Sequence, residues 1–308
     1  MPFPVRLPRP PAGDLIICAR NEEESIPAML RHAIDLGYNP DNVVIMVNGS
    51  TDNTAQVCDE FGIRASVMED FLARHGSLMD QIAQRFGVDP RNCSGKGLAI
   101  WSATLGYGMG RYQPTNPLFF LDADIDSARQ TNPFGALHRG WMNRHDSGGR
   151  MIKLAQIGEG GSQTRDLPVR QILGDIEPRA ARLRWPTCGQ LAISLGDLQR
   201  MRLPVGYTVE CSEVLQMIAM FGASSIVEME IRTVLRDATR TEDAVDGMHA
   251  RIKATLKACG DIQNLDLPCY NASAVTNGAI DRSSHPHDTG RPEAVLPSIA
   301  ELREAHLL

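Results

Sequence analysis

The chain has 308 residues, of which 43% are hydrophobic and 22% are charged, and its formal net charge is −6. These values are typical of a globular protein with a substantial core, and the negative charge argues against a broad surface for nucleic-acid phosphates. No apolar run reaches the roughly 18 to 20 residues that cross a bilayer, and the Pro-rich residues 1–11 do not look like a secretion signal.

The seven cysteines are scattered and include no Cys-x-x-Cys pair, which favours reduced thiols over disulfides or a zinc site. We therefore expect a cytoplasmic protein with small-molecule partners and no membrane association. Nucleic acid is disfavoured as a partner, although a local basic groove would keep it open. A homodimer is also left open.

The first half of the chain alternates short apolar runs with helical patterns, as successive strand–helix units of a largely parallel sheet do. Strands are predicted at residues 14–18, 43–47, 64–68, 118–121, 151–156, 190–194 and 225–231. Helices are predicted at residues 26–36, 71–86, 96–104, 195–202, 209–221 and 244–259, with a further helix that ends near residue 61. From residue 261 the composition indicates an extended arm, and residues 294–308 have the apolar spacing of a docking helix.

Asp122 and Asp124 directly follow the apolar run at residues 118–121. This order indicates a buried strand that presents carboxylates at its carboxyl edge, where α/β sheets bind ligands. Divalent cations prefer such oxygen ligands, and a diphosphate binds such a cation. A solvated turn or a helix cap would give the same Asp-x-Asp pattern. The choice between these and a metal site therefore depends on the other motifs of the chain.

Polar residues also follow the first two predicted strands. After the first strand, Ala19 allows a close backbone approach, and Glu22 offers a carboxylate to a ribose or a base edge. After the second strand, Gly49 permits a tight turn, and residues 50–52 suit either a nucleoside or the cap of the next helix. Glu23 also suits a helix N-terminus, where it would complement the helix dipole.

Lys96 lies between two glycines at the start of a predicted helix, an arrangement that suits a phosphate or the base edge of a nucleotide. The spacing is not that of a P-loop. Because the carboxyl ends of neighbouring parallel strands meet at one edge, we expect the segments that contain Glu22, Lys96 and Asp124 to surround one nucleoside-diphosphate site.

Residues 19–23, 49–54, 95–101 and 120–124 resemble the ordered motifs of GT-A fold nucleotide-sugar glycosyltransferases. Downstream, residues 158–165, 169–173, 188–192 and 203–210 resemble the acceptor half of glucosyl-3-phosphoglycerate synthases and the related mannosyl-3-phosphoglycerate synthases. The likeness covers roughly residues 14–235.

The resemblance implies an α/β fold of the GT-A type, in which a Rossmann-like, mixed but mainly parallel sheet is flanked by helices and followed by an acceptor lobe and a tail. Residues 12–157 would form the nucleotide-sugar-binding subdomain and residues 158–260 the acceptor-binding subdomain. Residues 261–308 would form a C-terminal arm that docks or dimerises.

The resemblance also implies roles for single residues. Asp124 would hold Mg²⁺ or Mn²⁺ against the diphosphate, Asp122 would face the donor ribose or sugar, and Glu210 would lie near the sugar. His249 is a further candidate metal ligand. The other implied contacts are Ala19, Arg20, Glu22, Asn48, Ser50, Lys96 and Ala123 for the nucleotide-sugar donor, and Gly161, Thr164 and Arg165 for the phosphate and carboxylate of the acceptor.

The chain departs from the family pattern at three places. The family has a metal-binding His soon after the strand that matches residues 225–231, whereas here Asp237, His249 or water would have to take its place. Gln190 stands where the family has Glu, and Thr208 where it has Gly. These departures leave the identity of the acceptor open.

The predicted function is metal-dependent transfer of a hexose, with retention of configuration, from a UDP- or GDP-linked sugar to a small phosphorylated or carboxylated acceptor such as 3-phosphoglycerate. An inverting enzyme would need a carboxylate base, for which Asp166 or Glu210 are the nominees. One alternative is a larger acceptor, such as a modified nucleobase in DNA, a lipid or a glycan, held by the arginines at 165, 170, 179, 182 and 184.

Two further alternatives concern the reaction itself. A nucleotidyltransferase would use the same metal and nucleotide, but it normally has a basic, Gly-rich loop after the first strand, whereas residues 19–24 are acidic. A non-catalytic nucleotide-sugar-binding protein would explain the missing His.

Overall fold

The computed structural model describes residues 13–110, 113–125, 131–156, 162–231, 242–258 and 292–308. Within these ranges, no helix has both the length and the apolar character needed to cross a membrane.

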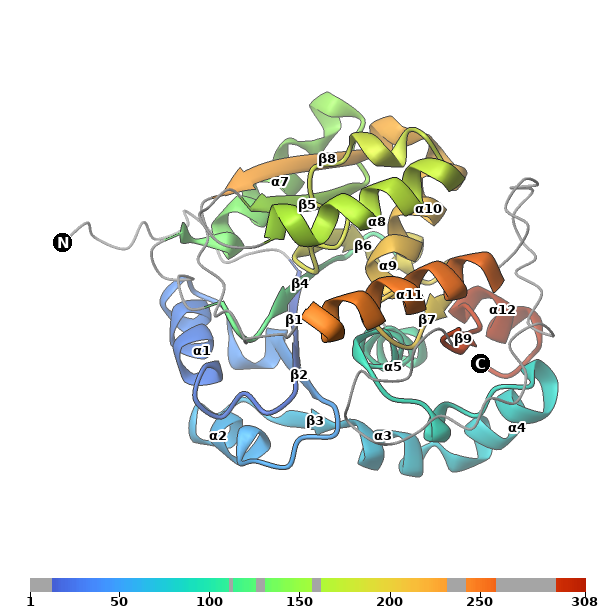
Figure 1. Cartoon of the computed structure of the whole chain (residues 1–308). Helices are drawn as coiled ribbons and strands as arrows, with labels where there is room; N and C mark the ends of the chain where they lie inside the picture. Colours follow the sequence, from blue (N-terminus) through green and yellow to red (C-terminus); the bar gives the residue numbers. More distant parts are fainter. Residues whose placement is uncertain (1–12, 111–112, 126–130, 157–161, 232–241, 259–291) are drawn as a thin grey trace.

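Seven strands form one sheet in the order β3-β2-β1-β4-β6-β5-β8 (Figure 1). The neighbours pair in parallel except β6, which runs antiparallel to both β4 and β5. A second, two-stranded sheet pairs β7 with β9. The strands are β1 Asp14–Ala19, β2 Val43–Val47, β3 Ala65–Val67, β4 Pro117–Asp122, β5 Met151–Gln156, β6 Leu191–Ser194, β7 Leu203–Pro204, β8 Ile226–Ile231 and β9 Val295–Leu296. The predicted mixed, mainly parallel α/β sheet is confirmed.

The central strands are apolar on both faces because helices cover both sides of the sheet. Side chains alternate along a strand, so in β1 Leu15 and Ile17 point into one apolar core and Ile16 into the other. The core of Leu15 and Ile17 includes residues from α1, α2 and α7, while the core of Ile16 includes residues from α3, α4, α5, α8, α10, α11 and α12.

The helices are α1 Ile26–Asp35, α2 Thr54–Glu60, α3 Met68–Arg74, α4 Gly76–Phe86, α5 Lys96–Met109, α7 Pro133–Ser147, α8 Ser162–Ile176, α9 Leu195–Leu198, α10 Val209–Phe221, α11 Glu242–Ala258 and α12 Ile299–Glu304. The helix predicted at residues 71–86 is divided into α3 and α4 because His75 has non-helical dihedral angles. The helix predicted at residues 195–202 ends at Leu198. The carbonyl of Gln199 instead accepts a hydrogen bond from Ala300 N at 3.0 Å.

The C-terminal residues 292–308 run along α5 and β7 (Figure 1). β9 pairs antiparallel with β7, and Leu296, Ile299 and Leu302 are buried in the core that also contains α5. A capping box at Ser298 and Glu301 starts α12. This part of the predicted arm therefore packs on its own chain.

The predicted boundary at residue 157 lies between β5 and β6, which are neighbours in the large sheet. The second half of the chain thus contributes β6 and β8 to the sheet that the first half begins. The division into donor and acceptor subdomains stays a prediction.

Candidate functional site

The centre of the site is an ion network around Lys96, the first residue of α5. Its Nζ donates to Asp122 Oδ1 at the end of β4 and to Glu210 Oε1 in the first turn of α10, the latter at 2.7 Å. The side chains of Lys96, Glu210 and Asp122 are 14%, 9% and 27% exposed. The structure therefore joins three predicted site residues that lie up to 114 positions apart.

Burial and charge act in opposite directions on these groups. Burial works to lower the pKa of Lys96, but the charges of Asp122 and Glu210 outweigh it and hold that pKa well above its ordinary value. Burial raises the pKa of Glu210 although Lys96 works against this, and Asp122 adds to the rise. One ammonium group is thus shared by two poorly solvated carboxylates.

Gln190 and Gly189 complete the surroundings of Asp122. Gln190 Nε2 donates to Asp122 Oδ2 at 2.5 Å, and its Oε1 accepts from Cys188 Sγ at 2.8 Å. A Cβ atom on Gly189 would lie 1.8 Å from Lys96 Nζ. Both oxygens of Asp122 are therefore held, and the ion network has its present shape because residue 189 has no side chain.

Asp124 lies two residues beyond the end of β4 and is half-buried. Burial raises its pKa to about 7, and the negative charges of Asp122 and Glu22 add to this effect, while Lys96 opposes it. The segments that carry Glu22, Lys96 and Asp124 thus share one electrostatic field, as expected for one edge of the sheet.

The loops after β1 and β2 are bonded to each other. Asn21 N donates to Ser50 Oγ at 3.0 Å, and Thr51 N donates to Asn21 Oδ1 at 2.8 Å. Glu22 N donates to Thr54 Oγ1 at 2.8 Å, and the Glu22 carboxylate accepts from Ser25 Oγ. The two loops therefore form one wall of the site.

Asp52 belongs to this wall rather than to the cap of α2. The N-cap of α2 is Asn53, so the predicted capping role of Asp52 is wrong. Its Oδ1 accepts from Thr54 N at 3.1 Å, and its Oδ2 accepts from Glu23 N at 3.0 Å. Desolvation works to raise the pKa of Asp52, but the hydrogen bonds from Thr54 and Glu23 outweigh it and lower that pKa.

The two glycines beside Lys96 have a packing role that the sequence did not reveal. Gly95 has φ +124°, and a Cβ atom on Gly97 would lie 1.7 Å from Pro204 O. Leu98 N donates to Val205 O at 3.0 Å. The glycines let α5 begin directly against the segment that leads into α10, which brings Lys96 to Glu210.

The remaining predicted donor contacts lie along the same edge. Ala19 ends β1 and is buried, and Arg20 follows it with an exposed side chain. Asn48 follows β2, and its N donates to Ala19 O at 3.1 Å. Ala123 is buried between Asp122 and Asp124. These four positions lie at the carboxyl ends of β1, β2 and β4, and their role as donor contacts stays a prediction.

The predicted acceptor contacts are only partly described. Gly161 lies outside the described residues, and Thr164 and Arg165 are in α8, whose side chains at 162–167, Asp166 included, also lie outside them. Asp237 lies outside as well, and His249 is in α11. Across the described ranges, no group of three or more His, Cys, Asp or Glu residues is arranged to hold a metal ion.

Several arginines proposed for a polyanionic acceptor have partners within the chain. Arg170 Nη2 donates to Ala181 O at 3.0 Å, and Arg179 pairs with Glu177 at 2.6 Å. Arg184 pairs with Glu230. These contacts weaken the case for a polymer-binding groove built from this cluster.

Sequence reasoning missed Lys153 and Glu213. Lys153 is fully buried in β5, and its Nζ donates to Cys188 O at 2.7 Å, next to Gly189. Glu213 is 1% exposed, and among the described groups none donates a hydrogen bond to its oxygens. Burial raises its pKa to about 7, Lys153 opposes this rise and Glu210 adds to it. A Lys inside an apolar strand was the available signal.

The chain resembles known proteins in sequence and in fold. Residues 14–70 match the family model described as glycosyl transferase family 2. A curated relative, the glucosyl-3-phosphoglycerate synthase of Petrotoga mobilis, is 20% identical over 234 residues, which are 74% of this chain and 66% of the relative. The match thus spans slightly less than two thirds of that relative.

Solved structures of the glucosyl-3-phosphoglycerate synthase from Mycobacterium tuberculosis have the same fold. One, in complex with Mn²⁺, UDP-glucose and phosphoglyceric acid, has a TM-score of 0.68 at 20% identity and covers 94% of this chain and 90% of that chain. Another, with Mg²⁺ and UDP, has a TM-score of 0.62 at 22% identity and covers 79% and 77%. The predicted GT-A fold and the suspected resemblance are confirmed, and the predicted enzyme class agrees with the family match.

Proposed function

We propose that the chain is a metal-dependent glycosyltransferase that moves a hexose from a UDP- or GDP-linked sugar to a small acceptor with a phosphate or carboxylate group, such as 3-phosphoglycerate. The observation that carries the proposal is that Lys96 binds both Asp122 and Glu210 at the carboxyl edge of the sheet. Asp124 follows Asp122 by two residues. The names of the similar structures favour UDP and glucose.

The surroundings of Asp124 fit a divalent cation. The carboxylate is half-buried and lies in the negative field of Asp122 and Glu22, which a cation would neutralise. Mg²⁺ and similar ions are commonly held by one or two carboxylates together with substrate phosphates, so a cluster of three protein ligands is not required. Asp124 would hold the ion, and His249 is the second candidate ligand. When bound, such an ion stabilises the charge that develops on the departing diphosphate.

The residues around Lys96 would orient the donor. Lys96 and Gln190 fix both oxygens of Asp122, which supports its role of facing the donor ribose or sugar. Lys96 also fixes Glu210, which we place near the hexose. Because these groups are already held by one another, little reorganisation accompanies the reaction, and such preorganisation lowers the barrier.

The wall formed by the loops after β1 and β2 would border the nucleoside. Glu22 and Ser50 belong to this wall, and their loops are joined by hydrogen bonds between backbone and side chains. A rigid wall suits recognition of a nucleoside because little conformational entropy is lost on binding. We assign Glu22 to the ribose and residues 48–50 to the base.

We favour retention of configuration. Inversion needs a carboxylate base against the acceptor hydroxyl, and Glu210 Oε1 is bound to the Lys96 ammonium at 2.7 Å. This oxygen is thus occupied by the ammonium group rather than open to an acceptor hydroxyl. Retention would have the acceptor attack on the face that the leaving group vacates.

The acceptor assignment rests on the start of α8. Thr164 and Arg165 fall in the first turn of this helix, which begins at Ser162. The first turn of a helix has unpaired backbone N–H groups and a positive dipole end, and both favour a phosphate or a carboxylate. This placement supports a small anionic acceptor.

The test is a donor and acceptor screen with the purified chain. UDP- and GDP-sugars are offered with Mn²⁺, Mg²⁺ or EDTA, with and without 3-phosphoglycerate or glycerol 3-phosphate, and nucleoside diphosphate release is measured. We expect release that needs donor, metal and acceptor together, and NMR of the product would give its anomeric configuration.

Lys96→Met should abolish this release, whereas Lys253→Met, at an exposed position of α11, should leave it unchanged. Equal release in EDTA, or binding of donor without turnover for every acceptor offered, would contradict the proposal.

A further inference from the structure

Lys96 and Glu210 belong to two segments that are joined to each other. The start of α5 packs on residues 204–206, where Gly95 and Gly97 leave room for the backbone and Leu98 N donates to Val205 O. Residues 205–208 then lead directly into α10, which carries Glu210 in its first turn. The position of residues 205–208 therefore determines how Lys96 and Glu210 meet.

Glu293, in the C-terminal segment, holds these residues from the opposite side. Its Oε2 accepts from Gly206 N at 2.9 Å and its Oε1 from Thr208 N at 3.4 Å. Val205 N donates to Ala294 O at 3.0 Å. The Glu293 side chain is buried, and its own N donates to Thr255 Oγ1 of α11 at 2.8 Å. A carboxylate on amides just before a helix also complements the positive end of that helix.

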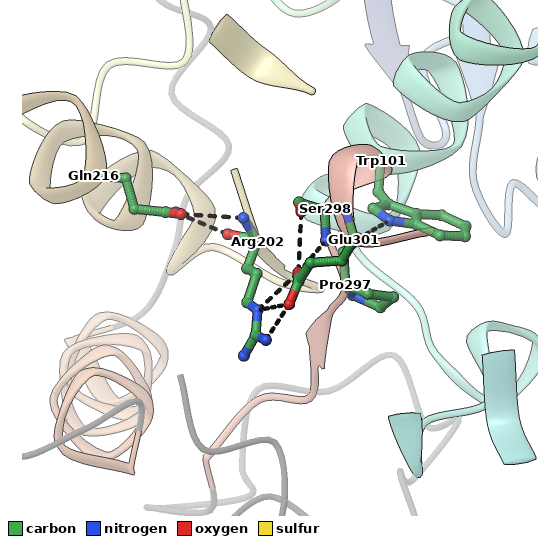
Figure 2. A network of polar contacts seen from close by, with 6 residues as sticks. All are labelled: Trp101, Arg202, Gln216, Pro297, Ser298 and Glu301. Carbon is green, nitrogen blue, oxygen red and sulfur yellow. Dashed lines mark hydrogen bonds and ion pairs between the residues drawn. The ribbon is translucent and has the colours of Figure 1, made fainter. Parts of the chain in front are cut away.

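The rest of the C-terminal segment is anchored to both helices that carry the site (Figure 2). Trp101 of α5 donates through Nε1 to Pro297 O at 2.8 Å. Arg202 Nε donates to Glu301 at 2.8 Å, and the backbone of Arg202 is bonded to Gln216 of α10 at 2.8 and 3.0 Å. The segment is therefore a fixed support on which α5 and α10 both rest.

We infer that Glu293 is a positioning residue: it fixes residues 206–208 and thereby holds the Glu210 carboxylate at the Lys96 ammonium. The inference uses the proposed function only where it assigns sugar transfer to Lys96 and Glu210. Glu293 lies 87 positions from Gly206 in the sequence, and it touches the site through the backbone rather than through a donor or acceptor contact.

The test compares the same chemical change at two places in the C-terminal segment. Glu293→Gln keeps the size of the side chain, but its amide NH₂ faces one of the two backbone N–H groups, so one hydrogen bond is lost. Glu301→Gln makes the same change at another position of the C-terminal segment, eight residues beyond Glu293. It weakens the ion pair between Glu301 and Arg202. For both variants, the melting temperature, kcat and the KM for the donor are measured.

We expect Glu293→Gln to lower kcat at least about tenfold with a donor KM within about twofold, because the support acts on groups that stabilise the transition state. Glu301→Gln should keep kcat within about twofold of the wild-type value, even if its melting temperature falls by as much as that of Glu293→Gln. If kcat falls in proportion to melting temperature in both variants, or if Glu293→Gln leaves kcat unchanged, the inference is wrong.

Amide hydrogen exchange gives a readout that does not depend on turnover. Glu293→Gln should speed exchange in peptides that contain residues 95–99 and 204–212, whereas Glu301→Gln should speed it mainly in residues 299–304. If the wild-type chain transfers no sugar, the proposed function fails, but unchanged exchange at residues 95–99 in Glu293→Gln would separately overturn the positioning role.

Discussion

The ion network at Lys96 and the network at Arg202 are buried to a similar extent but have opposite electrostatics. Lys96 is 14% exposed and Arg202 is 15% exposed. Burial raises the pKa of Glu210 in the first network and of Asp124 beside it. In the second, burial also works to raise the pKa of Glu301, but hydrogen bonds from Arg202 and Ser298 outweigh it and lower that pKa.

The difference arises from the number of donors available to each carboxylate. Glu301 receives hydrogen bonds from Arg202, from Ser298 N at 2.9 Å and from Ser298 Oγ at 3.0 Å. Lys96, by contrast, is shared by Asp122 and Glu210, with Asp124 and Glu22 nearby. A structural network balances its charges internally, whereas the site keeps negative charge that a divalent cation would balance.

Gly189→Ala should break the first network with the largest effect. The added Cβ atom would lie 1.8 Å from Lys96 Nζ and 2.7 Å from Glu210 Oε1, so the ammonium must move away. We expect sugar transfer to fall about 100-fold, the order seen when one preorganised donor is lost, while far-UV circular dichroism stays unchanged.

Gly76→Ala provides the matched control, because nothing lies within 4 Å of a Cβ atom at that helical position. It should keep full activity. If Gly189→Ala were as active as Gly76→Ala, the close contact at Lys96 would not matter for function.

The pH dependence of stability should have opposite signs for Glu213, which lies in the electrostatic field of Lys96 and Glu210, and for Glu301 of the second network. Burial raises the Glu213 pKa from 4.5 to about 7, so the folded state binds this proton more tightly than the unfolded state. Its contribution to stability is fully present below about pH 4.5 and is lost as pH rises through about 7. The contribution of Glu301, whose pKa is lowered, is instead lost as pH falls through its folded-state value.

Melting temperatures measured between about pH 3 and pH 8 without metal would test this. Glu213→Gln should flatten the decline toward pH 8, and Glu301→Gln should reduce the loss on the acid side. Glu213→Gln with the wild-type profile would argue against an unpaired buried carboxyl group at this position.

Ser298→Ala should have the smallest effect of these changes, and the effect should be on stability alone. The change removes the capping box of α12, which costs about 1 kcal/mol and lowers the melting temperature by roughly 1–2 °C in a chain of this size. Activity should stay within about twofold. A tenfold loss of activity at this small loss of stability would show that the second network is not separable from the site.

The sequence was sufficient to predict the residues at the ends of the parallel strands. Glu22 and Asp124 follow β1 and β4, which are parallel neighbours in the sheet, and such ends meet at one edge whatever the rest of the fold does. Lys96 was predicted from its place at a helix start. It was predicted as a contact for a phosphate or a base edge, and its ion pairs with Asp122 and Glu210 were not predicted.

The contacts that depend on strand direction and on distant segments could not be predicted. Residues 190–194 read as a strand, but only the structure has β6 antiparallel between β4 and β5, which places Gln190 beside Asp122, 68 positions away. The contact between Glu293 and Gly206 could not be predicted either, because the two residues are 87 positions apart in the sequence.

Two helices of the described ranges were also not predicted. α8 begins after a Gly-rich stretch and contains Pro168, both of which disguise a helix, and α7 has a weak apolar pattern.

The central claim is that Asp124 holds a divalent cation against the diphosphate of a nucleotide at this site. Titration calorimetry of UDP into the wild-type chain and into Asp124→Asn, each with Mn²⁺ and with EDTA, tests it most directly. We predict that Mn²⁺ tightens UDP binding at least about tenfold in the wild-type chain and has no effect in Asp124→Asn. An equal effect of Mn²⁺ in both proteins would contradict the account.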